Sequence, residues 1–212
     1  MPQHFQLKVV VITGGSDGIG KALVLAFLDA GAYVATCGRN LEKLELLGSS
    51  VKDNARLFTF KADVSKESDC ISFIEATINK FDRIDILINN AGISMRSLLT
   101  DCQTSVIQKL MDINFMGAVF CTKAALTFII QQKGVIVGIS SIAGYRGLPG
   151  RSGYSASKFA LNGWLESIKT ELAPLDVHVM WVAPGFTRTN IRNTALNAHA
   201  KEPVSYTHLR AH

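Results

Sequence analysis

The sequence contains few cysteines and histidines, and neither residue type is spaced for a metal site or a disulfide framework. The four cysteines are Cys37, Cys70, Cys102 and Cys121, and no two of them form a CxxC pair. The five histidines show no zinc-ligand spacing. We therefore expect reduced thiols, no bound metal and a cytoplasmic location.

Blocks of like charge and long apolar runs are also missing. The formal net charge is +5 over 212 residues, and the charges are scattered, so anionic small molecules are favoured as partners over nucleic acid. No apolar run approaches the ~20 residues of a membrane helix. The N-terminus enters its first predicted strand at once, which leaves no room for a signal peptide. We expect neither a membrane nor a nucleic-acid partner.

Apolar residues nevertheless make up 48% of the chain, enough for one substantial core. Apolar runs of strand length alternate with segments of helical periodicity, which predicts an α/β fold with a doubly wound, mostly parallel sheet. Six strands are expected, at residues 7–13, 32–37, 56–60, 84–89, 134–140 and 177–183. Helices are expected from the first glycine-rich turn to Gly31 and at 40–49, 66–81, 104–131 and 154–173. The pattern at 104–131 favours one long helix and leaves a break near Gly117 possible.

A glycine-rich turn, TGGSDGIG (13–20), joins the first predicted strand to the first helix. Glycines let the backbone approach a pyrophosphate, and a helix N-terminus offers it unpaired N–H groups. The spacing of Gly14, Gly18 and Gly20 matches neither GxGxxG nor the P-loop. A plain tight turn is the alternative, but the strand–turn–helix setting favours nucleotide binding.

The end of the second strand bears on which nucleotide binds. NAD-binding proteins commonly carry an acidic residue there, but this chain has Gly38 followed by Arg39. A guanidinium suits the 2′-phosphate of NADP, although a solvated surface arginine has the same appearance in sequence. The carboxylate of Asp17, in the glycine turn, is expected to disfavour the binding of a phosphate nearby. We predict NADP as cofactor, with NAD as the alternative.

Tyr154 and Lys158 stand four residues apart in GYSASK (153–158). On a helix this spacing places both side chains on one face. A free phenol is a poor acid–base catalyst at neutral pH because its pKa is about 10, and a nearby ammonium favours the phenolate. A solvated lysine at an exposed helix start is the alternative interpretation of the pair taken alone.

Several further motifs occur in one order along the chain: NNAG (89–92), DIN (112–114), SS (140–141), YSASK (154–158) and PG (184–185). Together with the glycine turn they resemble the short-chain dehydrogenase/reductase family over residues 6–192. The resemblance implies a single Rossmann-type domain, residues 1–203, in which six strands are present and a seventh is missing. It also implies assembly as a homodimer or homotetramer when the chain is full length.

The resemblance implies four catalytic residues: Asn114, Ser141, Tyr154 and Lys158. Tyr154 would exchange the proton, Ser141 would hydrogen-bond the substrate oxygen, and Lys158 would hold the nicotinamide ribose. Asn114 would anchor a water that links Lys158 to solvent. Taken alone, Asn89–Asn90 could merely close a strand, Ser140–Ser141 could be a loop pair, and Asn114 could be a core amide. The cofactor is expected to contact Gly14, Ser16, Asp17, Gly18, Ile19, Gly20, Arg39, Asp63, Val64, Asn90, Ala91, Gly92, Tyr154, Lys158, Pro184, Gly185, Thr187 and Thr189.

The activity implied is hydride transfer between NAD(P) and a carbonyl or secondary alcohol, with tyrosine as acid and base. An alternative substrate is a 3-oxoacyl chain on an acidic carrier protein, for which Arg96, Arg146 and Arg151 would form a docking patch. An alternative of another class is a nucleotide sensor without turnover. The intact set of Ser141, Tyr154 and Lys158 argues against a sensor, which needs no acid–base pair.

The C-terminal residues 204–212, VSYTHLRAH, show neither helical spacing nor a strand pattern. They resemble translated sequencing adapter, so we expect a non-native tail and a natural protein that continues beyond Glu202. The sixth strand is then expected at the edge of the sheet, although it is nearly all apolar.

Overall fold

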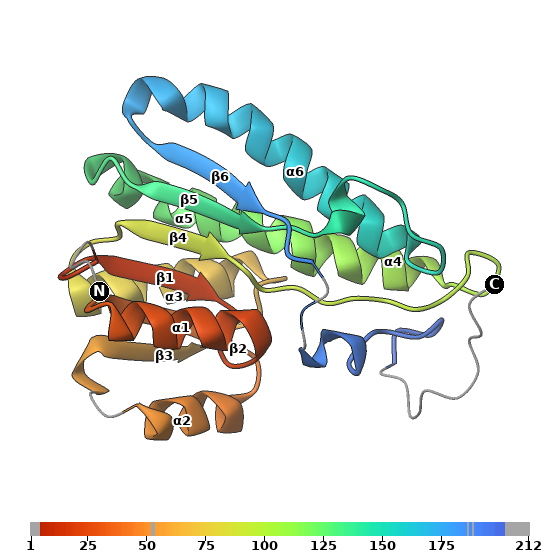
Figure 1. Ribbon diagram of the computed structural model, residues 1–212, viewed down its shortest axis with the longest axis horizontal. Helices are drawn as coiled ribbons and strands as arrows, with labels where there is room; N and C mark the ends of the chain where they lie inside the picture. The colour runs from red at the N-terminus through yellow and green to blue at the C-terminus, as the bar shows by residue number, and fades with distance from the viewer. Residues whose placement is uncertain (1–4, 52–53, 186, 188, 202–212) are drawn as a thin grey trace.

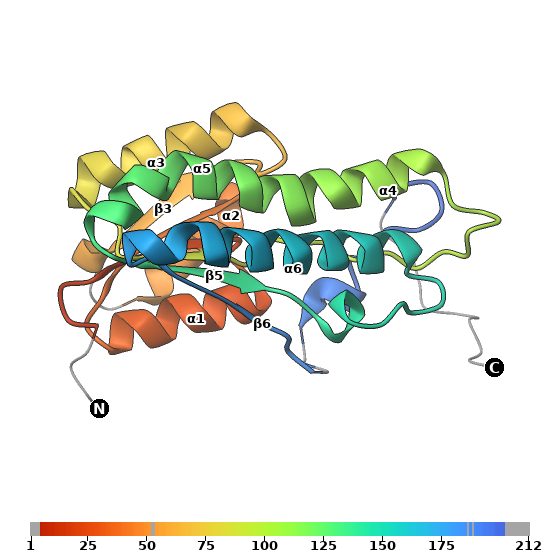
Figure 2. The ribbon, with the colours of Figure 1, turned by 90° about the horizontal axis from the view of Figure 1, so that it is seen from above.

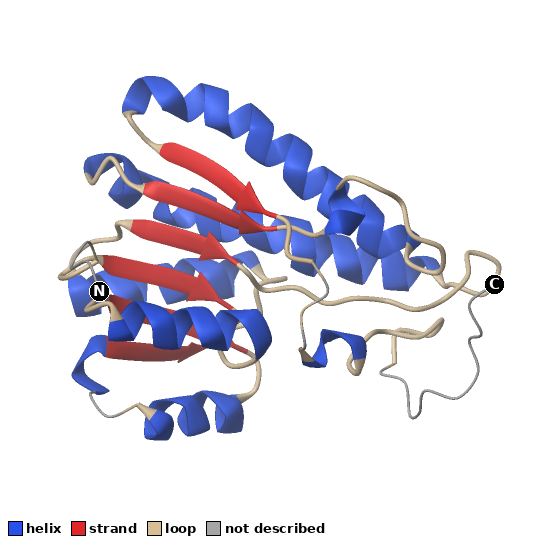
Figure 3. Ribbon diagram, in the orientation of Figure 1, coloured by secondary structure: helices blue, strands red, loops and turns tan. Residues whose placement is uncertain are grey.

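The computed structural model describes residues 5–51, 54–185, 187 and 189–201, so the tail predicted at 204–212 lies outside the described residues. Six parallel strands form one sheet in the order β3-β2-β1-β4-β5-β6 (Figures 1 and 3), which confirms the predicted α/β architecture. The strands are β1 (Val9–Thr13), β2 (Tyr33–Gly38), β3 (Leu57–Lys61), β4 (Ile86–Asn89), β5 (Val135–Ile139) and β6 (His178–Val182).

The main helices are α1 (Gly18–Asp29), α2 (Leu41–Ser50), α3 (Glu67–Phe81), α4 (Thr104–Met111), α5 (Gly117–Gln131) and α6 (Ser152–Leu172). Short 3-10 turns are η1 (Asn54–Arg56), η3 (Ile142–Gly144), η4 (Ala173–Leu175) and η5 (Asn190–Arg192), and η2 (Asp112–Met116) is a π turn. Each strand begins one or two residues later than the sequence predicted. At β1 the cause is Leu7, which is exposed with φ 65° and therefore belongs to a turn.

Helices cover the two faces of the sheet unequally. One core holds side chains of α1 and α2, such as Val24 and Leu47, against β1, β2 and β4. Helices α3, α5 and α6 lie on the opposite face (Figure 2), and their side chains form the larger core against the sheet. Met180 and Val182 of β6 are 40% and 42% exposed, so the sixth strand is an edge strand with exposed apolar side chains, as expected.

The long helix predicted at 104–131 is present, and the break left open near Gly117 does not occur. The π turn η2 joins α4 to α5 without a break, and a Cβ at Gly117 would lie 2.9 Å from the Val64 side chain, so this glycine permits close packing instead. Thr104–Gln131 is also long and apolar enough to cross a membrane by length and composition, contrary to our expectation. Its inner residues Cys121, Ala125 and Ile129 belong to the larger core, as in the core helix of a globular domain.

Candidate active site

A cleft of about 790 Å³ lies at the carboxyl ends of the strands. Parallel α/β sheets bind ligands at this edge, where the strand order changes direction, and here the change falls between β1 and β4. All eighteen predicted cofactor residues line the cleft, as does Ser141. Asn114 is the one predicted site residue that is not in its lining.

The glycine turn has the backbone geometry that a pyrophosphate site requires. Gly14 and Gly18 have φ values of 69° and 53°, which favour glycine. A Cβ at Gly20 would lie 2.3 Å from the Gly14 carbonyl oxygen and 2.4 Å from Asn90 Nδ2, so any side chain there would disrupt the turn. The open backbone before α1 is therefore a cradle that a dinucleotide fits.

Hydrogen bonds from neighbouring strands hold this turn in place. Asn90 Nδ2 donates to the carbonyl oxygens of Thr13 (2.8 Å) and Gly14 (3.1 Å). Thr36 Oγ1 accepts from Gly15 N at 3.0 Å, a support that the sequence analysis missed. Asn89 instead turns into the core and donates to Thr122 Oγ1, so only the second asparagine of NNAG serves the cleft.

Tyr154 and Lys158 face the cleft from one side of α6 and are only 7% and 4% exposed. The interpretation of Lys158 as a solvated surface lysine is therefore wrong. Its Nζ donates a 2.7 Å hydrogen bond to the carbonyl oxygen of Ile139, at the end of β5. Burial lowers the pKa of Lys158 to about 8. A Cβ at Gly92 would lie 3.7 Å from this ammonium, so the backbone after β4 passes directly beside it.

Asn114 lies behind the cleft, in the π turn. Its Oδ1 accepts from Ile93 N (2.8 Å), and its Nδ2 donates to Ile93 O (3.0 Å) and Ser157 Oγ (2.9 Å). Ser157 in turn donates to the Tyr154 carbonyl oxygen at 2.8 Å. The Asn114 side chain therefore ties the segment after β4 to the helix that carries Tyr154. The water-anchoring role expected of Asn114 stays a prediction.

The two serines after β5 have different surroundings. Ser141 lines the cleft and caps η3 by accepting from Ala143 N at 3.2 Å. Ser140 is buried and donates to Asn162 Oδ1 at 2.5 Å, while Asn162 Nδ2 donates to the Gly144 carbonyl oxygen at 3.0 Å. Asn162 thus fixes the loop around Ser141 at both ends, and the sequence analysis did not identify it.

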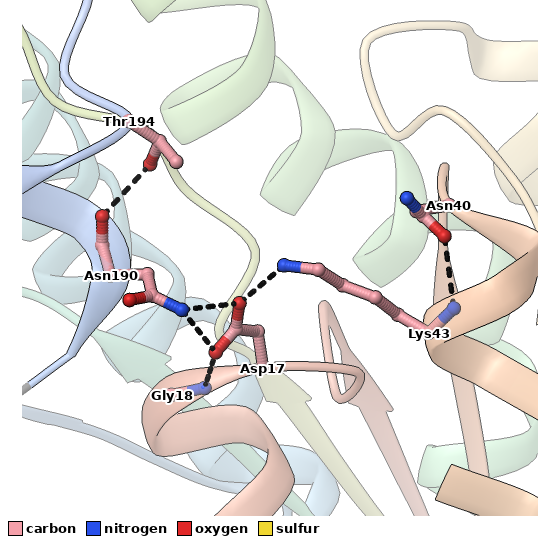
Figure 4. A network of polar contacts seen from close by, with 6 residues as sticks. All are labelled: Asp17, Gly18, Asn40, Lys43, Asn190 and Thr194. Atoms are coloured by element: carbon pink, nitrogen blue, oxygen red, sulfur yellow. Dashed lines mark hydrogen bonds and ion pairs between the residues drawn. The ribbon is translucent and has the colours of Figure 1, made fainter. Parts of the chain in front are cut away.

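Asp17 caps α1 and has two further partners, which come from distant segments (Figure 4). Lys43 Nζ lies 2.6 Å from Asp17 Oδ2, and Asn190 Nδ2 donates to the same oxygen at 3.1 Å. The Lys43 ammonium holds the pKa of the Asp17 carboxyl below its usual value; burial opposes this, and the Asn190 and Gly18 hydrogen bonds add to it. The negative charge that we expected to oppose a phosphate is therefore already paired.

The remaining predicted contacts lie on the walls of the cleft. Asp63 accepts from Ser65 N and Ser65 Oγ, and Arg39 is exposed with no hydrogen bond or ion pair among the described residues. A Cβ at Gly18 would lie 3.3 Å from the Thr189 side chain, so the segment after β6 reaches the glycine turn. No group of three or more His, Cys, Asp or Glu residues that could hold a metal is found in the described part of the chain.

The fold and this cleft define a Rossmann-type nucleotide-binding protein. The model of the short chain dehydrogenase family matches residues 8–200, and the chain therefore belongs to the short-chain dehydrogenase/reductase family of oxidoreductases. It is 37% identical over 201 residues to mouse "Dehydrogenase/reductase SDR family member 7B", covering 92% of this chain and 62% of the relative. It is also 37% identical over 187 residues to "11-beta-hydroxysteroid dehydrogenase 1A" of Arabidopsis thaliana, covering 87% and 53%.

Solved structures agree with this assignment. A Caenorhabditis elegans short-chain dehydrogenase/reductase of unknown function, solved with cofactor, has a TM-score of 0.85 at 31% identity and covers 91% of this chain and 74% of its own. Levodione reductase has a TM-score of 0.85 at 30% identity, covering 89% and 75%. NAD+-bound xylitol dehydrogenase has a TM-score of 0.82 at 31% identity, covering 86% and 72%. The chain spans less than two thirds of the length of the curated relatives named above.

Proposed function

We propose that this protein is an NADP-preferring oxidoreductase that transfers a hydride between the nicotinamide and an apolar ketone or secondary alcohol. One observation carries the proposal: Tyr154 and Lys158 are buried side by side on α6 and line the same cleft as the glycine turn. A phenol and an ammonium are rarely buried together at a ligand cleft unless they act on what binds there.

The chain's own residues supply the proton chemistry. The bound nicotinamide supplies or accepts the hydride. In reduction, Tyr154 gives a proton to the carbonyl oxygen, and in oxidation it takes the proton back from the hydroxyl. Ser141 donates a hydrogen bond to the same oxygen, where negative charge develops. The Asn162 contacts keep Ser141 in position for this hydrogen bond.

Lys158 supports the same proton transfer without contacting the reacting oxygen. Its ammonium has three donors, and the Ile139 carbonyl takes one, which leaves two for the ribose hydroxyls of the cofactor. Its positive charge stabilises the negative charge that develops on the Tyr154 oxygen as the proton is transferred. We assign the route by which Tyr154 regains its proton to Lys158 and a water held near Asn114, as the family resemblance implies.

The surroundings of Tyr154 support an apolar substrate. Tyr154 belongs to a cluster with Met95, Val106, Leu110 and Leu196, and Ile93 and Leu148 pack against it. Ile93, Leu148 and Leu196 also line the cleft. Such walls bind ring or chain hydrocarbons by burying apolar surface and offer little to a sugar. A relative's name refers to a hydroxysteroid, which is consistent with this chemistry.

We also propose that the full-length protein assembles as a homodimer or homotetramer through α6 and the long helix Thr104–Gln131, which carries Asn114. Phe159 of α6 is 47% exposed, and on the same helix the half-buried Trp164 forms a T-shaped pair with the half-buried Phe115, with ring centroids 6.3 Å apart. Exposed aromatic side chains are enriched at interfaces between subunits. Light scattering should give a particle of two or four chains, and a monomer at micromolar concentration would contradict this assignment.

The test of the function is a substrate panel followed by cofactor absorbance. The panel contains steroid, alicyclic and long-chain ketones, sugars, and 3-oxoacyl chains both free and on a carrier protein, each with NADPH and with NADH. We expect reduction of the apolar ketones, faster with NADPH. Turnover of sugars alone would contradict the substrate class, and turnover of carrier-bound chains alone would favour the 3-oxoacyl alternative. Cofactor binding without any turnover would favour a sensor.

A further inference from the structure

The Asp17 carboxylate joins three segments at the mouth of the cleft (Figure 4). It accepts from Gly18 N at 2.7 Å, from the Lys43 ammonium at 2.6 Å and from the Asn190 side-chain amide at 3.1 Å. Three donors, one of them charged, neutralise most of the negative field of a carboxylate. At the rim of the cleft, near Arg39, Asp17 therefore presents little uncompensated negative charge.

The backbone of Lys43 is fixed close to the end of β2. Asn40 caps α2 by accepting from Lys43 N at 2.9 Å, and Lys43 belongs to the first turn of this helix. Arg39, Asn40 and Lys43 all line the cleft. Lys43 is 45% exposed and Asp17 39% exposed at the side chain, so the pair lies at the rim, where a ligand can reach both.

Counting hydrogen-bond donors shows what Lys43 still offers. An ammonium has three N–H groups, and only the bond to Asp17 is found among the described residues. Asp17 thus holds the ammonium at the cleft and leaves two donors unused. Arg39, four residues earlier, makes no ion pair within the described residues. Two cations with unused donors at the end of β2 suit a doubly charged phosphate.

We propose that Lys43 is a second cation of the 2′-phosphate site beside Arg39, and that it also neutralises Asp17, which would otherwise repel that phosphate. This inference rests on the proposed NADP preference and deepens it. Lys43 is a specificity-determining residue: it raises the affinity for the 2′-phosphate of NADP and contributes little to the binding of NAD. Because Lys43 pairs with it, Asp17 can stand in the glycine turn without weakening the binding of the 2′-phosphate.

An ordinary surface ion pair has the same short distance, and the chain provides one as a control. Lys133 Nζ lies 2.7 Å from Asp176 Oδ2, with side-chain exposures of 71% and 65%, and neither residue lines the cleft. Lys133→Met removes one positive charge from the protein without touching the cleft. Comparing it with Lys43→Met separates a local effect on the 2′-phosphate from the change in net charge.

The experiment is calorimetric titration of the protein with NADP, NAD and adenosine 2′,5′-bisphosphate. Met keeps helix propensity and chain length at position 43, and Asn is a good N-cap at position 17, so the variants should fold. We expect Lys43→Met to weaken NADP and the bisphosphate about tenfold and NAD less than twofold. Lys133→Met should change none of them. Adding Asp17→Asn to Lys43→Met should recover roughly threefold in NADP affinity, because the unpaired carboxylate is gone.

The outcomes separate this inference from the proposed function. Equal loss for NADP and NAD, or no loss, in Lys43→Met would overturn the role of Lys43. No recovery in the double variant would overturn the neutralisation of Asp17. If Arg39→Ala alone discriminates between the cofactors, the NADP preference stands and only Lys43 is wrong. If the unsubstituted protein binds NAD as tightly as NADP, the cofactor preference and this inference both fail.

Discussion

Lys158 donates a 2.7 Å hydrogen bond from its buried ammonium to the carbonyl oxygen of Ile139, the last residue of β5. No acidic side chain pairs with Lys158 in the part of the chain that the structure describes. Burying a cation without a carboxylate partner destabilises the folded protein, and the same loss of hydration lowers the pKa of Lys158 to about 8. The proposed function accounts for this cost, because it assigns Lys158 to the binding of the cofactor ribose.

Lys158→Met should therefore stabilise the protein and abolish turnover. The folded pKa of about 8 lies below the ordinary 10.5, so the cost of charging the buried amine is fully present below pH 8 and disappears as the pH rises to 10.5. We expect the variant to be more stable at pH 7 by about 2 kcal/mol in urea unfolding, with the difference shrinking above pH 8. A variant that is less stable at pH 7, or a difference independent of pH, would show that the burial cost is absent.

Asp85→Asn should destabilise the protein at neutral pH by about 2 kcal/mol. Burial raises the pKa of Asp85, but hydrogen bonds from Arg83, Val9 N and Lys8 outweigh it and the pKa is lowered. The stabilisation is therefore present above the ordinary carboxyl pKa of 3.8 and is lost as the pH falls through the lower folded value. Unfolding curves of the two proteins should converge in acid. Asp176→Asn, in an exposed ion pair, is the control and should have no measurable effect.

Asn162→Ala should impair catalysis more than cofactor binding. It leaves the buried Ser140 hydroxyl and the Gly144 carbonyl without their partner, so the loop that carries Ser141 loosens. We expect kcat to fall about tenfold with the affinity for NADP unchanged, because only the hydrogen bond to the reacting oxygen is misplaced. Ser167→Ala, on an exposed position of the same helix, should leave both quantities unchanged. Equal kcat in the two variants would remove Asn162 from the positioning of Ser141.

Arg39→Ala should weaken NADP far more than NAD. A charge-assisted hydrogen-bonded pair contributes about 1.5–3 kcal/mol, which is roughly ten- to a hundredfold in affinity. Titration of the apoprotein with both cofactors measures the ratio directly. The loss should also diminish in high salt, because Arg39 is exposed. Equal losses for both cofactors would place Arg39 away from the 2′-phosphate.

Local patterns in the sequence predicted most of the fold and the cleft. Apolar runs of strand length located all six strands. Every residue of β1 is buried, as in a parallel strand covered on both faces, whereas β6 is equally apolar but lies exposed at the sheet edge. The glycine turn and YSASK were identified because their chemistry lies within eight and five consecutive residues. Whether the long helix breaks near Gly117 could not be decided locally, because glycine weakens a helix by propensity, whereas here its small size admits Val64 from a distant segment.

The contacts that the sequence analysis missed join residues far apart in the chain. Asn162 meets Ser140 across 22 positions, and Asn190 meets Asp17 across 173. An asparagine on a helix face or in a loop carries no local sign of such a partner. The sequence analysis did not single out Lys43, because only the packing of α2 beside the glycine turn brings it to Asp17.

The most direct test of the proposed function is the single-turnover reduction of an apolar ketone by Tyr154→Phe with NADPH bound. The substitution removes one hydroxyl from a buried ring and leaves the glycine turn and Lys158 in place. The account predicts that the rate falls by roughly 10²–10⁴-fold while the dissociation constant of NADPH changes less than about twofold. A variant that reduces the ketone at the rate of the unsubstituted protein would remove Tyr154 from the reaction and contradict the account.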